Sequence, residues 1–167
     1  MRLEALNLSS REAFVKSLGW VFEGSPWVAE ETWPTRPWNN VDTLHAAMCA
    51  MVERAPIARK LALIRAHPDL GSRAKMAQAS LSEQKGAGLD QLSPEEYERL
   101  QHRNREYAQK FGFPFILAVK GKTKEEVFAA LEERLGRSKE EELETALAQI
   151  YAIAGFRLRE AIEEGAA

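Results

Sequence analysis

The sequence predicts an all-α protein, and three observations lead to that prediction. First, Ser-x-x-Glu and Thr-x-x-Glu patterns, which are typical of helix N-termini, recur along the chain. Second, apolar residues follow these patterns at spacings of three and four, the period of a helix with one buried face. Third, only residues 113–119 form an apolar run without helical spacing, and a lone strand would have no pairing partner. We therefore expect a single-domain helical bundle of about eight helices over residues 1–167.

Start and stop signals divide the chain into these helices. The first four are expected from Ser9 to Gly19, from Ser25-Pro26 onward, from Asp42 onward and from Pro56 to about Ala66, because His67 precedes a proline and is disfavoured in the α region. The last four are expected to open at Ser80, Ser93, Thr123 and Ser138, and to end near Gly86, Phe111, Gly136 and Glu164 respectively. One extended segment, beginning in Phe111-Gly112-Phe113-Pro114-Phe115, interrupts the series.

Composition excludes several classes of protein. The chain has 167 residues, 45% of them hydrophobic, and a net charge of −2. Lysine and arginine alternate with glutamate instead of forming a basic stripe, so we expect no nucleic-acid partner. No apolar stretch reaches the ~20 residues of a membrane span, and the N-terminus lacks the apolar region of a signal peptide. The single cysteine, Cys49, excludes an internal disulfide, and we expect a cytoplasmic location.

Common metal-binding and nucleophilic patterns are not found in the sequence. The three histidines are not paired at metal-ligand spacings, so we expect no metal. No phosphate-binding glycine loop or Gly-x-Ser-x-Gly elbow occurs. His45 is expected in the core or at an interface, His102 on the surface, and Cys49 as a buried small hydrophobe rather than a nucleophile.

His67 is the best titratable candidate for catalysis. An imidazole changes charge near neutral pH and can therefore both accept and donate a proton. His67 follows a predicted helix and is fixed in direction by Pro68, which would aim the side chain into a cleft. The alternative is a histidine that only caps the preceding helix.

A second candidate is the group Ser80, Glu83 and Gln84. Ser80-x-x-Glu83 alone fits a capping box without further function. Gln84 beside Glu83, followed by small residues, places an amide next to a carboxylate, and this pair would suit the edge of a urea-like or imide group.

Two further features have both structural and functional interpretations. The run Phe113-Pro114-Phe115-Ile116 fits a plug in the core, but its irregular backbone also has polar groups that need partners. Arg157 lies between Phe156 and Leu158 in the last predicted helix, and a buried arginine needs an anion. A structural ion pair and a clamp for a substrate carboxylate fit this position equally well.

Taken together, these segments resemble 2-oxo-4-hydroxy-4-carboxy-5-ureidoimidazoline (OHCU) decarboxylase, the ureide-pathway enzyme that yields (S)-allantoin. The resemblance covers nearly the whole chain. It rests on Leu6-Asn7, Phe14, Gly19, Phe22-Glu23-Gly24-Ser25-Pro26-Trp27, Arg36-Pro37, His67-Pro68-Asp69-Leu70-Gly71, Ser80-x-x-Glu83-Gln84-x-x-Ala87-Gly88-Leu89, Asn104-x-x-Tyr107, Phe111-Gly112-Phe113-Pro114-Phe115 and Ile153-x-x-x-Arg157-Leu158. The chain departs from the family at Trp38, where phenylalanine is more frequent, and at Gly155-Phe156, where a basic residue and leucine are common. We expect Gly155 to loosen the helix that carries Arg157.

The resemblance implies an all-α carboxy-lyase that needs no cofactor, acts on a small ureidoimidazoline and forms a homodimer. It implies that His67 is the catalytic acid or base and that Glu83 orients His67 or holds a ring N–H. The implied substrate-binding residues are Pro68, Ser80, Gln84, Phe115, Ile116, Leu117, Ala118, Val119 and Arg157. Two alternatives stay open. One is a helical enzyme acting on another ureide or imidazolone acid, and the other is a non-catalytic module that binds a partner through its tryptophan-rich N-terminal third.

Overall fold

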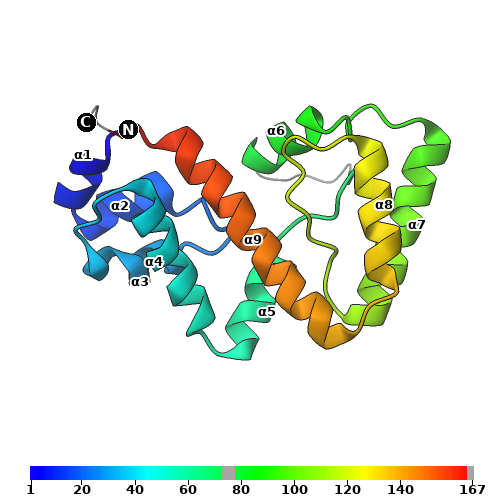
Figure 1. Ribbon diagram of the computed structural model, residues 1–167, viewed down its shortest axis with the longest axis horizontal. Coiled ribbons are helices and arrows are strands. Elements are labelled where there is room, and N and C mark those ends of the chain that lie inside the picture. Colours follow the sequence, from blue (N-terminus) through cyan, green and yellow to red (C-terminus); the bar gives the residue numbers. More distant parts are fainter. Residues whose placement is uncertain (73–77, 165–167) are drawn as a thin grey trace. The chain divides into compact units, whose positions relative to one another are not determined.

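The computed structural model of the chain describes residues 1–72 and 78–164 (Figure 1). Those residues form nine α-helices and one 3-10 helix, and their only β pairing is an isolated bridge between Arg2 and Glu163. The all-α prediction is therefore confirmed. None of the helices in these ranges is long and apolar enough to cross a bilayer.

The chain divides into two compact units, which are described separately. One unit contains Met1–Ala66 and the C-terminal part of the chain from Tyr151, and the other contains His67–Ile150. The final helix, α9 (Lys139–Ala161), contributes residues to both units. The single domain over residues 1–167 stays a prediction.

The first unit is built on helices that pack around a small apolar core. Its elements are α1 (Leu3–Leu8), α2 (Arg11–Leu18), α3 (Trp27–Thr32), the 3-10 helix η1 (Trp33–Thr35), α4 (Val41–Glu53) and α5 (Ile57–Arg65). α3 packs against both α2 and α4 (Figure 1). Phe14 of α2 is fully buried and stacks on Trp38, with 5.1 Å between the ring centroids. Each such buried aromatic ring contributes a large share of the apolar area removed from water.

Several helix starts in this unit differ from the predicted ones. The cap of α2 is Ser10, which accepts from the Ala13 N–H, because Ser9 already ends the unpredicted helix α1. The cap of α4 is Asn40 rather than Asp42. The Ser25 hydroxyl donates to the Glu23 carbonyl instead of capping α3.

The second unit contains α6 (Gln78–Gly86), α7 (Pro94–Phe111), α8 (Lys124–Leu135) and the first half of α9. α7 and α8 lie side by side (Figure 1). The capping boxes predicted at Ser93 and Thr123 are confirmed, and the Ser138 hydroxyl accepts from the Glu141 N–H at the start of α9. The capping box predicted at Ser80 is wrong, since α6 already includes Gln78 and Ser80 lies inside the helix.

The predicted extended segment is confirmed between α7 and α8. Gly112 ends α7 with a φ of 81°, a conformation that glycine adopts without steric cost. The residues that follow have neither helical nor strand structure up to Val119, yet nearly all are buried. Tyr107 and Phe111 of α7 pack against the rings of Phe113 and Phe115, which anchors the start of the segment in the core.

Candidate active site

His67 lies in a short turn directly after α5. Ala66 is the C-cap of α5, so the helix ends where the following proline requires it to end. His67 is 8% exposed, Pro68 is half-buried and Leu70 is buried. An imidazole with so little exposure is held in a defined direction rather than sampling solvent. We call residues 67–71 the histidine turn.

Two side-chain amides hold the histidine turn in place. The Gly71 N–H donates to Gln84 Oε1 over 2.9 Å, and Asn104 Nδ2 donates to the Leu70 carbonyl over 2.9 Å. Gly71 has a φ of +70°, and a Cβ there would lie 2.5 Å from Leu100 Cδ2. A side chain at position 71 would therefore be strained and would also collide with α7.

Two polar residues on α6, Ser80 and Gln84, face inward. Ser80 and Gln84 are 5% and 7% exposed, while Leu81 on the same helix is 47% exposed. Positions 80 and 84 share one helix face, and Glu83 is partly exposed. The contact with Gly71 fixes the direction of the Gln84 amide. Its oxygen is turned to the histidine turn, so Gln84 would meet a ligand as a donor through Nε2.

The extended segment also presents backbone groups, and several are bonded within the protein. The Ile116 carbonyl accepts from Arg134 Nη1, and the Ala118 N–H donates to Gln149 Oε1 over 2.9 Å. The Val119 carbonyl accepts from the Lys122 N–H. The expectation that this backbone needs polar partners is thus met in part by side chains of α8 and α9.

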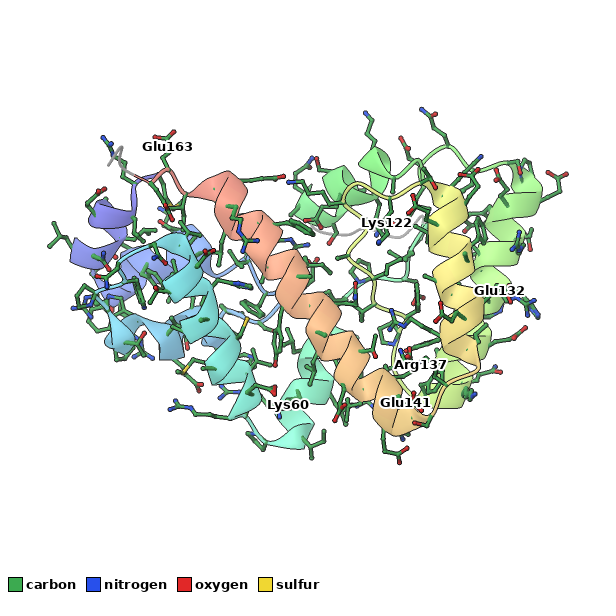
Figure 2. All side chains as sticks on the ribbon, viewed as in Figure 1. Lys60, Lys122, Glu132, Arg137, Glu141 and Glu163 are labelled. Carbon is green, nitrogen blue, oxygen red and sulfur yellow. The ribbon has the colours of Figure 1, made fainter. Side chains whose placement is uncertain are left out.

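Arg134 belongs to a buried network that the sequence interpretation missed. Its Nε lies 2.7 Å from Glu142 Oε1, the Tyr107 hydroxyl donates to the same carboxylate, and its guanidinium carbon is 4.4 Å from the Phe115 ring centroid. Glu142 and Tyr107 are fully buried. Burial raises the pKa of Tyr107, and its bond to the Glu142 carboxylate raises it further. Arg137, labelled between α8 and α9 in Figure 2, adds a second ion pair to Glu142 at 3.3 Å.

Arg157 lies in the first unit, on α9. It is 3% exposed, its Nη1 is 3.0 Å from the Glu23 carboxylate, and the same nitrogen donates to the Val21 carbonyl over 3.2 Å. A buried ion pair was one of the two predicted interpretations of Arg157, and this contact supports it. The expected loosening at Gly155 is not seen, since α9 continues through this residue.

The other titratable candidates have structural environments. Cys49 is half-buried, and burial together with the neighbouring Glu53 raises the pKa of its thiol to about 12, which keeps the thiol protonated at neutral pH. His45 Nε2 lies 2.7 Å from the Tyr151 carbonyl, and His102 is exposed beside Glu106 as predicted. Within residues 1–72 and 78–164 no group of three or more His, Cys, Asp or Glu side chains is arranged to hold a metal ion.

The structure thus brings most of the predicted site residues into one unit. His67, Pro68, Ser80, Glu83, Gln84 and residues 115–119 all belong to the second unit, whereas Arg157 belongs to the first. A direct bond joins the histidine turn to α6 through Gln84. A buried imidazole, a glutamine donor and an irregular backbone with oriented polar groups suit a small polar molecule that undergoes proton transfer.

Comparison with known proteins gives a consistent result. A family model described as OHCU decarboxylase matches residues 7–159. The chain is 44% identical to an OHCU decarboxylase of Halalkalicoccus jeotgali, covering 96% of this chain and 91% of that protein. It is also 44% identical to the uric acid degradation bifunctional protein of a Bacillus species, of which it spans 33%.

Two solved structures are similar to nearly the whole chain. A crystal structure of (S)-allantoin synthase has a TM-score of 0.79 and 32% identity, covering 98% of this chain and 54% of that one. A crystal structure of OHCU decarboxylase in the presence of (S)-allantoin has a TM-score of 0.71 and 25% identity, covering 91% of this chain and 97% of that one.

Proposed function

The chain belongs to the OHCU decarboxylase family, and from that premise we propose that it converts OHCU to (S)-allantoin in urate degradation. The observation that carries this proposal is the bond between Gln84 and Gly71, because it joins the turn that bears His67 to the helix that bears Ser80 and Glu83. The alternative of a module that only binds a partner gives no reason to bury an imidazole, a hydroxyl and an amide together.

The chemistry needs a proton acceptor and donor beside a planar substrate. On loss of CO₂, the bond between the carboxylate carbon and the ring carbon breaks, and its electron pair moves into the adjoining C=N/C=O system of the ring. A proton is then added to carbon. His67 acts as the acid or base in these steps, starting with the substrate hydroxyl. Its burial keeps bulk water from competing for that proton.

The remaining residues bind and orient the substrate. Glu83 orients the imidazole or accepts from a ring N–H, and Ser80 bonds the ureido or ring amide. Gln84 donates through Nε2 to a substrate carbonyl, since its oxygen is bonded to Gly71. Pro68 and the segment Phe115–Val119 line the planar face of the ring. Donors fixed in advance toward the developing charge stabilise the transition state by several kcal/mol in comparable sites, about 3 kcal/mol for one such donor.

Three parts of the proposal rest on the family resemblance rather than on contacts. Arg157 holds an anionic oxygen of the substrate. The protein acts as a homodimer. It acts without a cofactor. The cytoplasmic location is a further part of the proposal, and the single cysteine, Cys49, supports it because it fits a reducing compartment.

The test is an assay of stereospecific product formation. OHCU is unstable, so it is made in the cuvette from urate by the two preceding enzymes, and circular dichroism follows chiral allantoin. We expect the added protein to accelerate formation of the S enantiomer. If it changes neither the rate nor the handedness of the product, the proposed function is wrong.

A matched variant separates catalysis from folding. His67→Ala should abolish turnover while the far-ultraviolet helical signal and the denaturation midpoint stay near those of the unmodified chain. Loss of activity in proportion to loss of helix would instead favour a structural role for His67.

A further inference from the structure

One of the patterns behind the family resemblance, Asn104-x-x-Tyr107, has no part in the proposed chemistry. Residues three apart in a helix lie on the same face, and on α7 these two are 3% and 0% exposed. A buried asparagine and a buried tyrosine hydroxyl each need a specific partner. Asn104 bonds the histidine turn directly, and Tyr107 is connected to the extended segment 113–119 through two other side chains.

Asn104 bonds the histidine turn directly. Its Nδ2 donates to the Leu70 carbonyl, three residues after His67, over 2.9 Å. A carbonyl oxygen can only accept, so this contact fixes the direction of the amide. Asn104 Oδ1 is buried and has no hydrogen-bond partner in residues 1–72 and 78–164. A buried acceptor without a partner is costly, which indicates that the bond to Leu70 decides where this side chain lies.

Tyr107 reaches the extended segment through two charged groups. Its hydroxyl donates to Glu142, Glu142 accepts from Arg134, and Arg134 Nη1 donates to the Ile116 carbonyl. All three side chains are buried. Because no strand neighbours segment 113–119 in the part of the chain that the structure describes, this chain of bonds and the Gln149 contact replace a β-ladder in fixing its backbone.

We propose that Asn104 and Tyr107 are a positioning pair, which sets from one rigid helix the separation between the histidine turn and the Phe115–Val119 segment. The inference rests on the proposed function, in which the first segment supplies the acid or base and the second lines the substrate. Neither residue touches the substrate in this scheme. Their effect on rate comes from geometry, to which enzymes are sensitive: a displacement of ~1 Å can cost about a hundredfold.

The two ends of the pair predict different kinetic effects. Asn104→Leu keeps the branched shape in a larger side chain and removes the donor to the turn, so we expect kcat to fall about tenfold to a hundredfold with little change in KM. Tyr107→Phe removes one donor to Glu142 and leaves Arg134 in place, so we expect KM to rise several-fold with a smaller change in kcat. Asn104→Asp keeps the shape but removes the donor, and it replaces Asn104→Leu if that variant does not fold.

The control is Leu131→Ala, a cavity variant of a fully buried leucine on α8. The kinetic constants of all variants are normalised to the fraction of folded protein, which is measured by circular dichroism. A second measurement, the proton and carbon NMR shifts of the His67 ring, needs no turnover. We expect these shifts to move in the Asn104 variants and to stay unchanged in Leu131→Ala.

The outcomes separate this inference from the proposed function. Wild-type kcat and wild-type His67 shifts in a folded Asn104 variant overturn the positioning pair. The same kinetic change in Leu131→Ala would also overturn the positioning pair, because a general loss of stability would then explain the effect of the Asn104 variants. If the unmodified chain has no decarboxylase activity, the proposed function fails, while moved His67 shifts in the Asn104 variants still support the pair.

Discussion

Two buried arginine–glutamate pairs, one in each unit, have the same residue types and different surroundings. Arg134 and Glu142 have side chains 7% and 0% exposed, with 2.7 Å between them. Arg157 and Glu23 have side chains 3% and 7% exposed, with 3.0 Å between them. Ion pairs this deeply buried are seldom stabilising by themselves, since desolvation offsets the attraction between the charges.

The surroundings explain why both pairs are present. Arg134 also holds the Ile116 carbonyl in the extended segment, and Arg157 also holds the Val21 carbonyl in the turn after α2. In each case the arginine supplies donors to backbone that lies outside any helix. The two pairs differ in their further contacts and in their proposed roles. Glu142 also accepts from the Tyr107 hydroxyl, which adds a third buried side chain to the first pair. Arg157, in the second pair, is the residue that the family resemblance assigns to substrate binding.

The largest effect that follows from this comparison is on stability. Arg134→Met leaves Glu142 buried without its main counter-charge, and breaking a buried pair in this way costs about 3–5 kcal/mol. We expect that loss in the free energy of unfolding from urea denaturation. The control is Arg103→Met, which breaks the exposed pair with Glu132, labelled on α8 in Figure 2. Equal losses in the two variants would show that the buried network is no more important than a surface ion pair.

A smaller effect concerns the tyrosines that bond glutamates in each unit. Tyr107 bonds the buried Glu142, and Tyr151 bonds Glu53 on α4. We expect Tyr107→Phe to lose about 1.5–3 kcal/mol of unfolding free energy at neutral pH, the usual range for a hydrogen bond to a charged group. Tyr151→Phe should lose less, because its bond is exposed.

The same variants have a defined pH dependence. Burial raises the pKa of both tyrosines above the usual value of 10 in the folded chain, with the glutamates adding to it. The unfolded state therefore loses these protons first, so stability present below pH 10 declines as the pH rises toward the folded pKa values. Each Phe variant should show a shallower decline above pH 10 than the unmodified chain. If neither variant changes the slope of the unfolding free energy against pH above pH 10, the tyrosine hydroxyls do not cause this pH dependence.

Much of the fold could be predicted because its signals are local. The capping boxes at Ser93 and Thr123, the proline after His67 and the glycine at 112 each act within a few residues, and each matches the structure. The error at Ser9 has an equally local cause. Two adjacent serines can each cap a helix, and the choice of Ser10 depends on α1 ending at Leu8.

The network around Arg134 could not be predicted in this way. Arg134 stands in the run Glu132-Glu133-Arg134-Leu135, which fits a solvated helix face, and its partner Glu142 lies on another helix. Burial of both charges depends on contacts between helices that are distant in the sequence, such as the packing of α7 on α8 and the bond from Tyr107 to Glu142, and no short sequence window contains them. Arg157, by contrast, is distinguished in the sequence by the apolar residues that flank it. The pattern Asn104-x-x-Tyr107 contains one member of the network, Tyr107, but its spacing does not indicate which partners that tyrosine has.

A further prediction tests whether the pair of Arg157 and Glu23 does more than stabilise the fold. Arg157→Lys keeps the charge opposite Glu23 but replaces a planar fork with a point charge. Glu23→Gln removes the charge of the partner and keeps the arginine. If Arg157 also holds a substrate oxygen, kcat/KM should fall about tenfold more in Arg157→Lys than in Glu23→Gln, a difference of ~1.4 kcal/mol. Equal losses would leave Arg157 with the structural role alone.

The smallest predicted effect lies on the same helix, at the glycine that departs from the family pattern. A Cβ at position 155 would lie 3.1 Å from His45 Cε1 and 3.0 Å from Arg159 Nη1. Gly→Ala inside a helix usually gains about 1 kcal/mol, but here the His45 ring, whose Nε2 lies 2.7 Å from the Tyr151 carbonyl, would have to move. We therefore expect Gly155→Ala to change the unfolding free energy by no more than a few tenths of a kcal/mol.

A double-mutant cycle tests whether crowding against His45 offsets the gain in helix propensity from Gly155→Ala. In a His45→Ala background the crowding is removed, so Gly155→Ala should recover most of the ~1 kcal/mol that helix propensity provides. The difference between the two backgrounds measures the contact between His45 and α9. A full gain from Gly155→Ala in the unmodified chain would mean that His45 yields without cost, and the glycine would then have no packing reason to interrupt the apolar face of the helix that carries Arg157.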